Sequence, residues 1–181
     1  MKKNLLFLPL LIASSLYGDA HVYFGTGIAH VSEKLDSTDK SITNTQKSIK
    51  IGYGIRDSYA VEFALDYTPN NKTYFASDDG RKYGFSVDLI KAYDFGIFIN
   101  PYLKLGFGAG ALQTTADLNN NSLKYGTFNT AVGFFIPLSS QFDVEMAYQY
   151  KYVSYEKINL ATSDNPNSNL NLAYIGFNIR F

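Results

Sequence analysis

The 181-residue chain has no cysteine, no tryptophan and only two histidines, His21 and His30. Without cysteine it can form neither a disulfide framework nor a thiolate metal site, and two histidines are too few to favour a zinc site. Its 16 basic and 16 acidic residues balance, so no net positive charge favours nucleic acid as a partner. The glycine pairs Gly25/Gly27 and Gly52/Gly54 do not indicate a phosphate-binding loop, because no helix is expected after them. No cofactor is therefore expected.

Long apolar runs are also missing, since no stretch approaches the roughly 20 residues that a membrane-spanning helix needs. Aromatic residues are abundant instead, with 15 tyrosines and 14 phenylalanines. Both types favour strands and membrane interfaces. If this chain enters a membrane, it does so as strands.

Residues 1–20 have the pattern of a secretory signal peptide. Lys2 and Lys3 supply the positive start, and a short apolar core runs from Leu5 to Ala13. Cleavage is expected before His21, and a cut after Gly18 fits nearly as well. The alternative is an N-terminal helix that is retained as an anchor. After cleavage, residues 21–181 form one domain.

Eight segments of the remaining chain alternate between apolar residues and small or polar ones, with the period of two that is typical of strands. The clearest is Tyr59–Tyr67, and the last, Ala173–Phe181, ends the chain on a phenylalanine. The eight segments span residues 22–29, 48–55, 59–67, 83–89, 103–110, 128–136, 142–152 and 173–181.

The connections between these segments alternate in length. Short turns are expected at 56–58, 93–96 and 137–140, and long polar loops at 32–47, 68–81, 113–122 and 156–169. Outer-membrane barrels have short turns on the periplasmic side and longer loops outside the cell. The pattern thus predicts an all-β protein, an eight-stranded antiparallel up-and-down transmembrane β-barrel with four extracellular loops.

A soluble lipocalin-like barrel has the same number of strands but places apolar side chains inside. In this chain the face opposite the apolar one carries most of the charges of the strands. They are Lys50, Glu62, Asp66, Asp88, Lys104, Asp143, Glu145, Lys151 and Arg180. A lysine or arginine facing lipid at mid-membrane would cost about 2–4 kcal/mol, which favours the arrangement with the charges inside.

The end of the chain resembles the C-terminal sorting signal of bacterial outer-membrane barrels, through Gly176, Ile179 and Phe181, although Ile179 replaces the usual aromatic residue. The segment Pro101–Gly110, a proline and an aromatic followed by alternating glycines, is similar to the mid-barrel strand of the same proteins. The chain therefore resembles the small eight-stranded outer-membrane barrels of the OmpA transmembrane-domain, OmpX and opacity-porin type. The resemblance implies an integral outer-membrane protein of a Gram-negative bacterium, exported by its signal peptide and assembled through its C-terminal strand.

The nearly balanced interior charges are expected to pair, because an unpaired charge in a narrow interior is costly. The first hypothesis is a scaffold closed by ion pairs, whose loops contact an extracellular ligand or a host surface. Its other expected partners are outer-membrane lipid, lipopolysaccharide and the barrel-assembly machinery. The alternative is a small, low-conductance porin.

A lipid-modifying enzyme is a further alternative. It would use His30 with Ser77, Asp78 or Asp79. The chain lacks the histidine-x-serine pattern of lipid A deacylase barrels, and a histidine at a strand end is more often an interfacial residue. We therefore expect no catalytic residues, no metal and no enzymatic activity.

Overall fold

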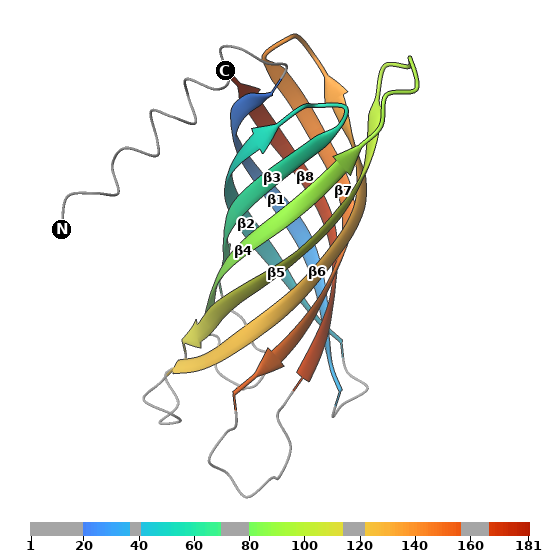
Figure 1. Cartoon of the computed structure of the whole chain (residues 1–181). Helices are drawn as coiled ribbons and strands as arrows, with labels where there is room; N and C mark the ends of the chain where they lie inside the picture. Colours follow the sequence, from blue (N-terminus) through green and yellow to red (C-terminus); the bar gives the residue numbers. More distant parts are fainter. Residues whose placement is uncertain (1–19, 37–40, 70–79, 114–121, 157–166) are drawn as a thin grey trace, which may run out of the picture.

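The computed structural model describes residues 20–36, 41–69, 80–113, 122–156 and 167–181. Within these residues the chain forms eight antiparallel strands that close into one barrel (Figure 1). β1 pairs with both β2 and β8, so the sheet has no free edge. The strands are β1 (His21–Leu35), β2 (Ser41–Gly54), β3 (Tyr59–Thr68), β4 (Arg81–Ala92), β5 (Asn100–Gln113), β6 (Ser122–Pro137), β7 (Phe142–Tyr155) and β8 (Asn167–Arg180). The predicted fold class is confirmed.

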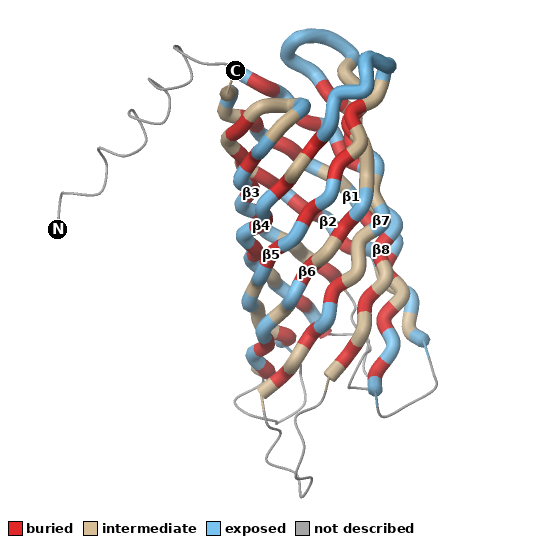
Figure 2. Tube along the Cα trace, turned by 45° about the vertical axis from the view of Figure 1, so that its right-hand side comes forward, coloured by how far each residue is buried: buried red, intermediate tan, exposed pale blue. Residues whose placement is uncertain are grey.

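The alternation of side chains separates the two faces of the barrel wall. On β1, Phe24 and Ile28 are about half exposed, whereas Tyr23, on the other face of the same strand, is fully buried. The same alternation runs along every strand, and buried and exposed positions alternate along the tube in Figure 2. The apolar side chains face outward in the phase predicted for each segment. Such a wall suits lipid, and closure gives backbone N–H and C=O groups partners that lipid cannot supply.

The two ends of the barrel differ. Connections 55–58, 93–99 and 138–141 lie at one end, which we call the turn end, together with the first residues of β1 and the last of β8. The end where β1, β3, β5 and β7 finish is called the loop end and lies at the bottom of Figure 1. Among the described residues, none forms a helix of the length and apolarity needed to span a membrane.

The strands continue further toward the loop end than the sequence pattern indicated. Residues 32–47 were expected to form a loop, but β1 continues to Leu35 and β2 begins at Ser41. Lys34 pairs with Ser41, and the hydroxyls of Ser32 and Ser41 lie 2.7 Å apart. Backbone pairing does not require apolar side chains. Beyond the lipid, strand residues can be polar on the outer face, and the apolar alternation that identifies a strand disappears.

Two smaller corrections concern β8 and the connection between β4 and β5. β8 begins at Asn167, inside the segment 156–169 that was expected to be a loop. The turn expected at 93–96 extends to residue 99. It is held by the backbone N–H of Gly96, which donates to the Asp94 carboxylate at 2.7 Å, and Gly96 has φ +67°, a value that glycine adopts without strain.

Candidate functional site

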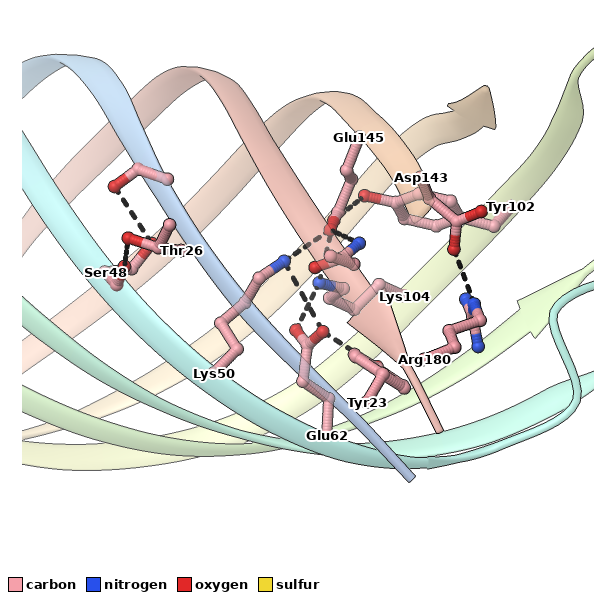
Figure 3. Close-up of polar contacts among 12 residues, drawn as sticks. Tyr23, Thr26, Ser48, Lys50, Glu62, Tyr102, Lys104, Asp143, Glu145 and Arg180 are labelled. Atoms are coloured by element: carbon pink, nitrogen blue, oxygen red, sulfur yellow. Dashed lines mark hydrogen bonds and ion pairs between the residues drawn. The ribbon is translucent and has the colours of Figure 1, made fainter. Parts of the chain in front are cut away.

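The centre of the barrel contains two carboxylates and two ammonium groups that alternate in space (Figure 3). Lys104 Nζ lies 2.6 Å from Glu62 Oε1 and 3.4 Å from Glu145 Oε1. Lys50 Nζ lies 3.4 Å from Glu62 Oε2 and is also in direct contact with Glu145. Each carboxylate thus meets both lysines. We call these four residues, which come from β2, β3, β5 and β7, the central network.

Neutral donors complete the coordination of the two carboxylates. The Tyr23 hydroxyl donates to Glu62 at 2.8 Å, and the Tyr102 hydroxyl donates to Glu145 at 2.5 Å. Asn178 Nδ2 donates to Glu145 at 3.2 Å. All of these side chains are buried. Buried charges are tolerated when ion pairs and additional hydrogen bonds satisfy them together, and this arrangement meets that condition.

A second ion-pair group lies nearer the turn end. Arg180 Nε lies 2.5 Å from Asp143, and Arg56 Nε contacts the other carboxylate oxygen of Asp143 at 2.8 Å. Arg56 belongs to the turn between β2 and β3, and it also donates to the carbonyls of Ser139 and Ser140 in the turn between β6 and β7. This group therefore connects two turns to the closing strand. Arg56 was not among the predicted interior charges, because it lies outside the alternating segments.

The remaining predicted interior charges differ in how they are satisfied. Lys151 Nζ lies 2.5 Å from Asp66. Asp88 is also buried, but among the described residues it has no ion-pair partner; Ser86 Oγ donates to it at 2.8 Å and Asn129 Nδ2 at 3.3 Å. Asp88 is therefore satisfied by neutral donors rather than by one of the interior cations. A carboxylate needs donors, and neutral side chains at the same level supply them.

A further polar cluster near the loop end was not predicted. Lys82 Nζ lies 3.0 Å from Glu33 and 2.8 Å from the hydroxyl of Tyr155, while Ser168 Oγ donates to Glu33 at 2.7 Å. All four residues are buried. Glu33 and Ser168 fall in segments that were expected to be loops. Glu33 lies an even number of residues after the inward-facing Tyr23 on β1. If the strand had been extended to residue 33 in the same alternation, Glu33 would have been predicted to face inward.

The interior is also less polar than the sequence suggested, because apolar clusters lie on both sides of the central network. Tyr23, Tyr102 and Phe135 belong to the cluster at the turn end, with the Tyr102 and Phe135 rings 4.7 Å apart. A larger group at the loop end, called here the loop-end plug, consists of Ala29, Val31, Leu112, Leu123, Tyr125, Val153, Tyr155, Leu170 and Leu172. An eight-stranded barrel is just wide enough for its side chains to fill it.

Two small spaces remain in the interior of the described barrel. One, of about 20 Å³, is lined by Asp66, Lys82 and Lys151 among others, and the second, of about 30 Å³, adjoins the central network. A cavity needs about 10–15 Å³ to hold one water molecule. Each space therefore has room for one or two waters.

The residues of the predicted C-terminal assembly signal lie on the strand that closes the barrel. Gly176 faces the interior and pairs with Gly27 of β1, whereas Ile179 faces outward. The backbone N–H of Phe181 donates to the carbonyl of Val22 at 2.9 Å, and the Phe181 ring packs edge-on against Phe24 with ring centroids 5.9 Å apart. The signal residues thus also form the β1–β8 seam.

The two histidines lie outside the central network. His30 is exposed and pairs with Thr45 and Ala173 on neighbouring strands. Its suggested partners Ser77, Asp78 and Asp79 lie outside the described residues. His21 Nδ1 lies 2.8 Å from the carbonyl oxygen of Phe181. Among the described residues, no three His, Asp or Glu side chains gather in a way that could hold a metal ion.

Solved structures of small outer-membrane barrels share this fold. Neisserial surface protein A is 20% identical, with 88% of this chain and 97% of that chain covered and a TM-score of 0.64. Ail, the attachment invasion locus protein of Yersinia pestis, in complex with the heparin analogue sucrose octasulfate, is 15% identical, with coverage of 90% and 99% and a TM-score of 0.58. The outer-membrane enzyme PagL is 7% identical, with coverage of 83% and 97% and a TM-score of 0.50. Similarities at these identities show the fold alone.

No curated protein sequence matches the chain. The outer membrane protein beta-barrel domain matches residues 5–181, which is nearly the entire chain. This match agrees with the closed barrel, its apolar outer wall and its outer-membrane neighbours in structure. The chain belongs to the outer membrane protein β-barrel domain family.

Proposed function

We propose that this outer-membrane barrel is a closed scaffold that holds its loop end at the cell surface for contact with other molecules. The observation that carries the proposal is the filled interior. The central network occupies the middle of the barrel, the loop-end plug fills its outer part, and the two interior spaces described above measure about 20 and 30 Å³. A barrel filled in this way transports little, which leaves the loop end as the active surface.

Contact with an extracellular ligand or host surface is the activity we propose for that end. The complex of Ail with a heparin analogue illustrates that a barrel of this fold can bind a molecule of that kind. In this chain, the cations Lys34, Arg81 and Lys124 are exposed near the loop ends of their strands.

A low-conductance porin is the second candidate. The two interior spaces share Gln46, Asp66, Ser86 and Lys151 in their linings, so they neighbour each other along the barrel. Rearrangement of the pair between Asp66 and Lys151 would join them. The joined spaces would form the charged middle part of a path for small ions, and their shared lining is the observation that favours a pore.

The conductance of the refolded mature barrel in a planar bilayer distinguishes the two. For a closed scaffold we expect no discrete channels from the parent protein. Lys104→Ala and Glu62→Ala remove one charge each from the central network, and Gln149→Ala is the matched control, because it shortens a neutral side chain that lines the same space. Steady channels in the parent, with a conductance that changes in the two charge variants but not in Gln149→Ala, would replace the scaffold by the porin.

Export and assembly are also part of the proposal. Residues 1–20 direct export and are removed, with the cut after Ala20 or after Gly18, and N-terminal sequencing of the outer-membrane protein decides between them. Recognition of the last strand by the assembly machinery is tested by deleting Phe181. We expect less folded protein. Its amount is measured on a detergent gel as the intensity of the band that is present in the unboiled sample and shifts on boiling. Full assembly of the truncated chain would contradict the proposed signal.

We propose no enzymatic role. The outward position of His30 on the barrel wall supports this, since it lies apart from the interior acids and hydroxyls. The structure of PagL nevertheless illustrates that this fold also occurs in an enzyme. Incubation of the folded barrel with lipopolysaccharide, followed by mass spectrometry of the lipid, tests the proposal. Loss or transfer of an acyl chain that depends on His30 would overturn it.

A further inference from the structure

The outer wall of the barrel has a groove of about 480 Å³ across β1, β2, β3 and β4. It is much larger than either interior space and opens outward. We call it the wall groove. Its outward-facing lining consists of Thr26, Ile49, Leu65, Lys47, Tyr67 and Tyr83.

The floor of the wall groove is apolar. Ile49 and Leu65 are paired across β2 and β3, and their side chains are 66% and 60% exposed. Thr26 pairs with Ile49 and is a small side chain between Phe24 and Ile28 on the outer face of β1, which creates the hollow. Its hydroxyl donates to the carbonyl of Ser48 at 3.1 Å and so offers little to a polar ligand. A hydrocarbon chain matches this floor.

The side of the groove toward the loop end is polar. Lys47 pairs with Tyr67, and Tyr67 pairs with Tyr83, so these residues form one row across three strands, two positions closer to the loop end than Ile49 and Leu65. The two tyrosine rings are 5.2 Å apart. Lys47 is exposed, and among the described residues no carboxylate lies within ion-pair distance of it. A free cation thus stands beside two phenols at the end of an apolar groove.

This arrangement has the chemistry of a membrane interface. Tyrosines concentrate where hydrocarbon meets headgroups, and a lysine near that level extends its ammonium group toward the polar layer. Lipid is the medium that surrounds the outer wall, so the groove is continuous with a surface that lipid already covers. The ammonium group of Lys47 adds selectivity for a negative headgroup.

We propose that the wall groove binds a lipid whose headgroup carries a net negative charge, from the leaflet at the loop end. One acyl chain lies along Thr26, Ile49 and Leu65, the phosphate pairs with Lys47, and the hydroxyls of Tyr67 and Tyr83 donate to the headgroup. The inference rests on the proposed outer-membrane placement of the loop end and makes the lipid partner specific. Channel recordings and the gel shift on boiling do not depend on Lys47, so a failure of the lipid site leaves them unchanged.

A tryptophan reporter tests the proposal directly, because the chain contains no tryptophan. Phe63→Trp places the reporter on the outer face of β3, two residues from Leu65, without filling the groove. Tyr148→Trp is the matched reporter on the outer face of β7, four strands away in the closed barrel. Each folded protein is placed in phosphatidylcholine vesicles that contain either brominated phosphatidylglycerol or brominated phosphatidylcholine. Quenching then gives the relative binding of the anionic and the neutral lipid.

At Phe63→Trp we expect the anionic lipid to bind about fivefold more strongly than the neutral one, the effect of one lysine near a lipid phosphate. At Tyr148→Trp the ratio stays near one. In the Phe63→Trp protein, Lys47→Gln removes the preference, whereas Lys124→Gln, the same charge change on the outer face of β6, leaves it. Thr26→Leu fills the floor with Lys47 intact and also lowers the ratio. Equal ratios at the two reporters, or equal losses with Lys47→Gln and Lys124→Gln, would overturn the proposal.

Discussion

The middle and the loop end of the barrel interior are filled in different ways. In the middle, four charged groups and two tyrosine hydroxyls depend on one another, and each carboxylate has several partners. At the loop end, the plug is mostly aliphatic, and the pair of Glu33 and Lys82 adjoins it through Tyr155. Removing one member of a shared network leaves several partners unsatisfied, whereas removing one apolar side chain leaves a cavity. The two regions should therefore respond differently to single substitutions.

The largest loss of stability is expected for Glu145→Ala. This carboxylate meets Lys50, Lys104 and Tyr102, so its removal leaves two buried ammonium groups with one carboxylate between them. Breaking a buried ion pair costs about 3–5 kcal/mol. Urea unfolding in lipid vesicles, followed by circular dichroism, measures the free energy of unfolding. The control is Gln149→Ala on the same strand. A loss as small as that of the control would show that the central network is not mutually dependent.

The loop-end plug is tested by Leu172→Ala. Leu172 is fully buried on β8 and belongs to the apolar cluster there. Truncating a buried leucine costs about 2–5 kcal/mol, according to how far the site collapses. Leu172→Met keeps the volume and should cost less than about 1.5 kcal/mol. The same unfolding experiment applies. Equal losses in the two variants would mean that shape rather than cavity volume limits this region.

A smaller effect is expected for Gly52→Ala, which tests how closely the wall approaches the central network. A Cβ at Gly52 would lie 2.1 Å from Cζ of the Tyr23 ring, and the hydroxyl of that ring donates to Glu62. Overpacking of this kind costs about 1–3 kcal/mol. A double-mutant cycle with Tyr23→Leu measures the coupling, because the shorter side chain should remove most of the cost. Additive losses would place the strain elsewhere.

The barrel could be predicted from the sequence because strand parity has a single physical cause. In every strand, one face meets lipid and the other does not, so the apolar residues fix the phase, as in Tyr59–Thr68. The same signal ends where the lipid ends. Glu33 and Ser168 lie in paired strands whose outer residues are polar, so this part of each strand was interpreted as a loop.

The central network was only partly predictable. Parity placed Lys50, Glu62, Lys104 and Glu145 on the inner face, but it contains no information on which strands meet across the lumen. The pairing of Arg56 with Asp143 depends on the position of a turn, and the satisfaction of Asp88 by Ser86 and Asn129 depends on their relative heights in the closed barrel. These relations follow from the register and closure of the sheet, and a single sequence does not encode them locally.

The smallest effect is expected at the boundary between the two regions, where Asp66 pairs with Lys151 and lines both interior spaces. Asp66→Asn keeps a hydrogen-bond acceptor for Lys151 and removes the charge. The Asp66 side chain is 13% exposed and adjoins space for water, so water can solvate the remaining Lys151 charge, and we expect a loss of about 1 kcal/mol, the upper value for an ion pair with access to water. Urea unfolding measures it against Glu145→Ala. A loss that matches Glu145→Ala would extend the mutually dependent network to this level of the barrel and erase the contrast between the two regions.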